Sequence, residues 1–129
     1  MRSQLLVFLG STACLPDLGG QWSGECHFED ESYDERSFVL ADVTSGRGNR
    51  VEGSLDVSMF DGRELTGPFS GIRSDTFIEL SANLPTQDGT FTFSADADLD
   101  EDEMSGSCTL RVPGGSNGSG LSGELLLER

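Results

Sequence analysis

Apolar and polar residues alternate along most of the chain, which is typical of β-strands that bury one face. The clearest stretch places Val51, Gly53, Leu55, Val57 and Met59 on one face and polar residues on the other. A helix would scatter these five positions around its axis. The segment therefore predicts a strand.

Seven further segments carry the same alternation, and turn residues such as Asp61 and Gly62 separate them. They cover about residues 21–29, 36–44, 63–73, 78–84, 91–97, 104–112 and 121–127. The predicted fold class is all-β, an antiparallel eight-stranded up-and-down meander that closes into a small barrel. A two-sheet β-sandwich is the alternative.

The unit apolar-x-Gly-x-apolar occurs five times, with its glycine on the inward face. It spans residues 22–26, 51–55, 65–69, 104–108 and 121–125. A glycine at such a position lets a strand bend sharply or leaves room for a large neighbour, and Trp22 is a candidate neighbour. The alternative is that the missing side chains leave a hollow for a ligand.

The length of 129 residues is suited to one domain. The formal net charge of −15 disfavours nucleic-acid binding, because such a surface repels phosphate backbones. The charge predicts either a soluble, self-repelling coat or a surface that attracts cations and basic partners.

The N-terminus reads as an export signal, with Arg2 followed by the apolar run from Leu5 to Leu9. The residues up to Cys14 (STAC) resemble a bacterial lipobox, although Ser11 stands where that family usually has Leu. The resemblance implies a lipid-anchored protein of the bacterial envelope, in the periplasm or at the outer membrane. Ordinary signal cleavage or a buried first strand are alternatives. The expected organisation is a signal over 1–14, a tether over 15–19 and a barrel domain over 20–129.

The Gly20-Gln21-Trp22 sequence at the start of the first strand resembles the calycin group of lipocalin-like and avidin-like barrels. The segments LTGPF, MSGSC and LSGEL are similar to avidin-type strands. In that group a basic residue of the last strand packs over the Trp, and Arg129 and Arg111 are candidates here. Biotin binding is not implied, because the chain has one Trp and one Tyr. The resemblance extends to small bacterial lipoproteins of unassigned function.

Cys26 and Cys108 form an even pair in a chain predicted to be exported, which favours a disulfide. Two buried free thiols are the alternative. The pairing is awkward for a closed meander, because the first strand neighbours the second and eighth strands but not the seventh. A flattened or staggered barrel would be needed to bring the two Cα atoms within about 7 Å.

The groups that enzymes use are mostly missing from the sequence, so no enzyme and no cofactor are predicted. The lone histidine, His27, lies beside Glu25 and Glu29 on an outward face, where a solvated residue is the ordinary interpretation. No Cys/His cluster has zinc spacing.

Acidic side chains crowd the hairpin at 96–103, where weak Ca²⁺ binding is chemically possible. The alternative is a hydrated turn that keeps a sheet edge from pairing with other chains. A second acidic loop, at 29–35, has the same two interpretations. The candidate calcium ligands are Asp96, Asp98, Asp100 and Asp102.

The leading functional prediction is a non-enzymatic lipoprotein domain for binding or envelope-surface interaction. A protease inhibitor that inserts the tether before Trp22 into an enzyme cleft is the first alternative, and a small-molecule carrier is the second. A hydrolase that uses carboxylates alone has no residue-level support. Several large side chains are expected to occupy the interior: Trp22, Phe28, Phe69, Phe91 and Phe93.

Overall fold

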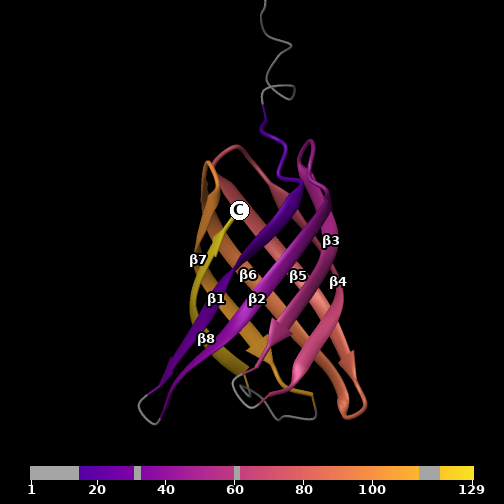
Figure 1. Cartoon of the computed structure of the whole chain (residues 1–129), viewed down its shortest axis with the longest axis vertical. Coiled ribbons are helices and arrows are strands. Elements are labelled where there is room, and N and C mark those ends of the chain that lie inside the picture. Colours follow the sequence, from indigo (N-terminus) through magenta and orange to yellow (C-terminus); the bar gives the residue numbers. More distant parts are fainter. Residues whose placement is uncertain (1–14, 31–32, 60–61, 114–119) are drawn as a thin grey trace, which may run out of the picture.

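The computed structural model of the chain is a closed barrel of eight antiparallel strands, each paired with the next and the last paired with the first (Figure 1). It describes residues 15–30, 33–59, 62–113 and 120–129. The strands are β1 Gly20–Asp30, β2 Tyr33–Ser45, β3 Arg50–Ser58, β4 Glu64–Arg73, β5 Phe77–Thr86, β6 Gly89–Asp100, β7 Glu103–Arg111 and β8 Gly120–Glu128. The predicted meander is confirmed, and the sandwich alternative is wrong because one continuous ladder runs around the ring.

Two ends of the barrel can be told apart in Figure 1. The upper end carries the C-terminus, the start of β1 and the connections β2–β3, β4–β5 and β6–β7. At the lower end the β1–β2 hairpin reaches beyond the ring. It does so because β8 pairs only with residues 23–28 of β1, and β3 pairs with β2 only from Phe38 onward.

The predicted alternation is confirmed along the described strands. In β3, for example, Val51, Leu55 and Val57 are buried and Glu52 is exposed. The inward side chains form one continuous core: Leu18, Trp22, Cys26, Phe28, Val39, Ala41, Val43, Val51, Leu55, Val57, Met59, Leu65, Phe69, Ile78, Leu80, Ala82, Leu84, Phe91, Phe93, Ala95, Ala97, Leu99, Met104, Cys108, Leu110, Leu125 and Leu127. Burial of this much apolar surface is the main stabilising contribution to the fold.

Three details differ from the sequence predictions. Val112 was expected on the inward face but is exposed, because β7 ends at Arg111 and the chain leaves the ring there. Leu18 lies in the predicted tether, yet it is fully buried. The acidic segment at 29–35 is largely strand, because β1 continues to Asp30 and β2 begins at Tyr33.

The glycines of the repeated unit are required by close contact between strands. A Cβ atom on Gly53 would lie 2.0 Å from the carbonyl oxygen of Asp42 on β2, and one on Gly123 would lie 2.0 Å from that of His27 on β1. Gly24, Gly67 and Gly106 meet a neighbouring backbone oxygen in the same way. The inward glycines thus permit strong local bending of the sheet, as the bending interpretation predicted, and they are not gaps kept open for a ligand.

Candidate functional site

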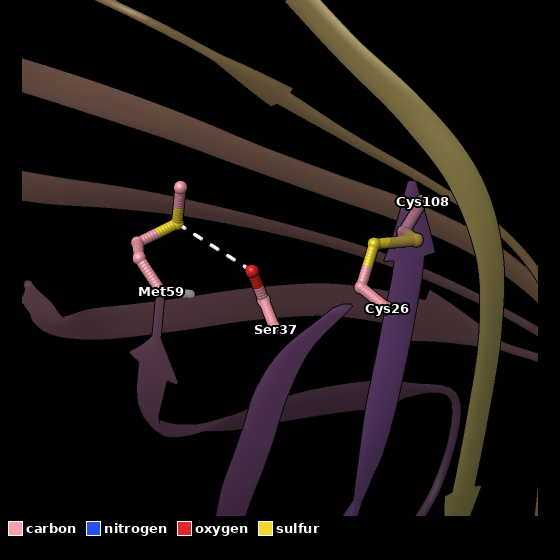
Figure 2. Close-up of a disulfide and its surroundings, with 4 residues drawn as sticks. All are labelled: Cys26, Ser37, Met59 and Cys108. Carbon is pink, nitrogen blue, oxygen red and sulfur yellow. Dashed lines mark hydrogen bonds between the residues drawn. A yellow bond between two sulfur atoms is a disulfide. The ribbon is translucent and has the colours of Figure 1, made fainter. Parts of the chain in front are cut away.

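A disulfide joins Cys26 on β1 to Cys108 on β7 on the inner face, with the Cα atoms 6.2 Å apart (Figure 2). The bridge passes over β8, where Leu125 lies opposite Cys26 and Gly123 lies opposite Cys108. Gly123 places no side chain beneath the bridge, and the bent sheet brings β1 and β7 within reach of each other. The bond therefore forms within a closed meander although the first and seventh strands are not neighbours.

The surroundings of the disulfide are apolar except for one hydroxyl group. Ser37 lies opposite Cys26 on β2 and is fully buried. Its hydroxyl donates a hydrogen bond to the sulfur of Met59 at 3.6 Å (Figure 2). A thioether is a weak acceptor, so this contact satisfies the hydroxyl without providing a group that activates it.

Trp22 fills the upper end of the barrel and is held from two sides. Its indole N–H donates to the carbonyl of Leu18 at 2.9 Å, and the guanidinium of Arg129 lies 4.7 Å from the ring centroid. Arg129 also donates to Asp102 and to the carbonyl of Asp17, at 2.8 and 2.9 Å. Arg129, and not Arg111, is thus the basic residue that packs over the Trp. Gly20 precedes this site with a φ of 118°, a conformation that favours glycine.

The segment at 15–19 closes the upper end of the barrel. The amide of Leu18 donates to the carbonyl of Gly46 at 3.1 Å, and its side chain joins the core. Asp17 pairs with Arg47 at 3.2 Å. The hydrogen bond from the Gly19 amide, together with Arg47, lowers the pKa of Asp17 below its usual value. This segment is packed onto the barrel and differs in that respect from the expected tether.

Arg73 is a buried cation at the same end of the barrel. Its guanidinium donates to the carbonyls of Pro16, Gly46 and Ser74. One terminal nitrogen, Nη2, has no hydrogen-bond partner among the described residues. Burial lowers the pKa of Arg73, and the charges of Asp75 and Asp17 act in the opposite direction. These bonds join the segment at 15–19 to the β2–β3 and β4–β5 connections.

The candidate calcium ligands do not converge. Asp96, Asp98 and Asp100 project outward from successive exposed positions of β6, about 7 Å apart along the strand. Asp102 is engaged by Arg129. Within the described part of the chain, no three His, Cys, Asp or Glu side chains gather so that they could hold a metal ion. The sequence predicted that this strand would end near residue 97, but β6 continues to Asp100. Its carboxylates therefore follow one another along the outer face instead of meeting in a turn.

Other predicted residues fall in different places. His27 is half-buried on the outer face, opposite Glu124 on β8 and Arg36 on β2. Cys14 and the predicted signal lie outside the described residues. Over the described ranges, no helix has the length and apolar character needed to span a bilayer.

Among the described residues, three open grooves of about 400 Å³ or more lie on the outer face, and each includes one glycine of the repeated unit. Groove 1, of about 540 Å³, contains Gly53 and polar side chains of β2 to β5. Groove 2, of about 400 Å³, contains Gly24 together with Phe38, Asp56 and Glu64. Groove 3, of about 550 Å³, is lined by Glu25, His27, Asp98, Ser105, Gly106, Glu124, Leu125 and Leu126. The bends that close the barrel therefore coincide with hollows on its outside.

Sequence reasoning missed two outward apolar side chains beside these grooves. Phe38 is 66% exposed and Leu126 is 45% exposed. Both are cross-strand partners of Glu25, from β2 and β8 respectively. The sequence does mark both residues, because each interrupts the alternation by placing an apolar side chain at a position expected to face outward. Their meeting around Glu25 depends on the register of strands far apart in sequence.

Comparison with known proteins supports the fold alone. No protein-family model and no curated protein matches the chain. Among solved structures, that of EF1p2_mFAP2b bound to DFHBI is similar, with a TM-score of 0.68 and 13% sequence identity. The alignment covers 95% of this chain and 99% of that chain. This likeness agrees with the closed barrel described above.

Proposed function

We propose that this protein is a non-enzymatic binding domain of the bacterial envelope, exported and anchored by a lipid on Cys14. Its barrel acts as a rigid support, and partners bind its outer face. The observation that carries the proposal is the filled interior, in which the inward side chains of all eight strands form one core. A barrel packed in this way has its remaining binding capacity on the outside.

The filled interior counts against a small-molecule carrier. Trp22, Phe28, Phe91 and Phe93 are each at most 1% exposed, and the disulfide crosses the same space. The three grooves described above open to the outer face. The likeness to a DFHBI-bound barrel concerns the fold and does not transfer that ligand to this chain.

The protease-inhibitor alternative depends on a free segment before Trp22. That segment is packed down here, since Leu18 is buried and Arg73 binds the carbonyl of Pro16. Inserting it into an enzyme cleft would break these contacts and expose the indole ring of Trp22. A lipid on Cys14 would add a further hindrance, so the binding domain is the better interpretation.

Metabolic labelling tests the anchor. Bacteria expressing the full chain are fed an alkyne fatty acid, and the protein is fractionated and probed for label. We expect label and membrane association in the parent chain, and loss of both in Cys14→Ala. Cys108→Ala is the matched control, because it removes a different cysteine and keeps the label. An unlabelled parent chain in the soluble fraction would overturn the proposed anchor.

A further inference from the structure

Three of the exposed large apolar side chains lie along one line that runs around the outside of the barrel. Phe77, Leu126 and Phe38 are 38%, 45% and 66% exposed. Consecutive cross-strand pairs connect them through six strands, from β5 to β2. We call this line the apolar row; its members in order are Phe77, Asp98, Ser105, Leu126, Glu25 and Phe38.

The spacing along the row is set by the sheet. Neighbouring strands lie about 4.8 Å apart, so along the sheet Leu126 lies two strand spacings, about 10 Å, from Phe38 and three strand spacings, about 14 Å, from Phe77. Because the row passes over six of the eight strands of a closed barrel, its ends face different directions, and one bound segment can cover Phe38 and Leu126, which flank Glu25. Ile72, which is 54% exposed, lies off the row opposite Glu79 and serves as an internal comparison.

Carboxylates occupy the positions between and beside these apolar groups. Glu25 lies between Leu126 and Phe38, and Asp98 adjoins Phe77. Glu124 lines groove 3 together with Glu25 and Asp98. Asp56 and Glu64 line groove 2 beside Phe38. Two described basic side chains lie near these carboxylates. Arg36 lies 3.7 Å from Glu25, and His27 lines groove 3. The local charge is therefore strongly negative.

We propose that the apolar row docks a basic polypeptide segment in which apolar side chains alternate with Lys or Arg. The segment's apolar groups cover Phe38 and Leu126, and its cations lie over Glu25, Asp98 and Glu124 in groove 3. This proposal rests on the proposed function, because a filled barrel must bind from outside. It adds the chemistry of the partner and the location of its site.

Charge decides between the possible occupants. A second copy of the chain also carries a net charge of −15, and an anionic lipid surface is negative as well, so both are repelled by the carboxylates. Strand addition at the row is disfavoured, since β1 and β8 pair there and the ring is closed; unpaired strand edges lie in the part of the β1–β2 hairpin that reaches beyond the ring. A cationic segment with apolar side chains complements both features of the row.

The test measures fluorescence anisotropy with the purified full chain and a labelled peptide of repeated Leu-Lys-Lys. In the polyproline II conformation, which has three residues per turn, this repeat places successive Leu residues on one face about 9 Å apart, close to the spacing of Phe38 and Leu126. A peptide of the same composition with all Leu residues at one end is the control ligand. We expect the repeat peptide to bind more tightly than the control, and its affinity to fall as salt rises.

Two sets of variants locate the site. Phe38→Thr with Leu126→Thr should weaken the Kd about tenfold, whereas Ile72→Thr should change it less than about twofold. Glu25→Gln, Asp98→Asn and Glu124→Gln together should also weaken it about tenfold and flatten the salt dependence. The charge-matched control combines Asp42→Asn, Glu52→Gln and Glu79→Gln. Thr favours strands, and unchanged melting temperatures confirm that the variants fold.

Equal losses in the row variants and in their controls would overturn the proposal, because binding would then not depend on where the apolar and acidic groups lie. Unchanged affinity in the row variants would overturn it too. So would sedimentation showing a dimer that Phe38→Thr with Leu126→Thr dissolves, since the row would then bind a second copy. The assay is independent of Cys14, so a failed lipid label and a failed peptide assay are separate results.

Discussion

The inner and outer faces of the barrel come from the same strands but differ in composition and in regularity. The described inner face is apolar apart from Ser37 and Arg73, and every strand contributes to it. The outer face is mainly hydroxyl and carboxyl groups, interrupted by a few exposed apolar side chains. The regular face accounts for the fold, and the irregularities of the other face point to function.

The disulfide gives the largest expected effect on the inner face. Cys26→Ala with Cys108→Ala should lower the free energy of unfolding by about 4 kcal/mol, because the bond closes a loop with a sequence separation of 82. Urea denaturation measures the change. Cys14→Ala is the control and should leave the stability unaltered. A double variant as stable as the parent would mean that packing alone holds the inner face.

The next largest effect tests the bending glycines. Gly53→Ala should cost about 3 kcal/mol, since its Cβ would collide with the backbone of Asp42 and the strands would have to separate. Gly120→Ala is the matched control, because its Cβ meets only ordinary contacts, the nearest at 3.5 Å, and should change stability by less than about 0.5 kcal/mol. Equal costs would contradict the steric explanation.

Arg129 lies where the two faces meet at the upper end. Arg129→Met keeps much of the side-chain volume but removes the contact with the Trp22 ring and the bonds to Asp102, so we expect a loss of about 1–2 kcal/mol. The emission of Trp22 should shift as well. Arg111→Met, on the exposed part of β7, should leave both measurements unchanged. A larger effect at Arg111 would reverse the assignment.

Asp17 gives the smallest effect, because it is exposed. Its pKa is lowered in the folded state, so the stability that it contributes is present above its unfolded pKa and is lost as the pH falls through the folded value. Asp17→Asn should therefore melt slightly below the parent at neutral pH, and the two melting temperatures should converge as the pH falls below the folded pKa of Asp17. A difference that grows in acid would contradict this sign.

The sequence was sufficient for the inner face because its rules are local. Val51 to Met59 alternate strictly, and that period alone identifies a strand and its buried side. The closure of the sheet into a barrel was predicted from the count of eight strands, a number that allows a small closed barrel. The burial of Leu18 was not predictable, since it depends on Gly46 in a turn from another part of the chain.

The candidate site could not be assembled from the sequence. Phe38, Phe77 and Leu126 are visible individually as apolar residues at outward positions, but they form a row only through the registers of six strands. A shift of one residue in a single pair would send one of them to the other face. The choice of Arg129 over Arg111 likewise required the position of Trp22 in space.

The pairing of β1 with β8 also determines when the fold can form. Phe28 and Gly123 are partners, so the ring stays open until nearly all of the chain is available. Structures dominated by such distant pairings fold in milliseconds to seconds, well behind those built from local contacts. For the exported chain proposed above, this late closure gives a period in which the polypeptide is still linear enough to be threaded across a membrane.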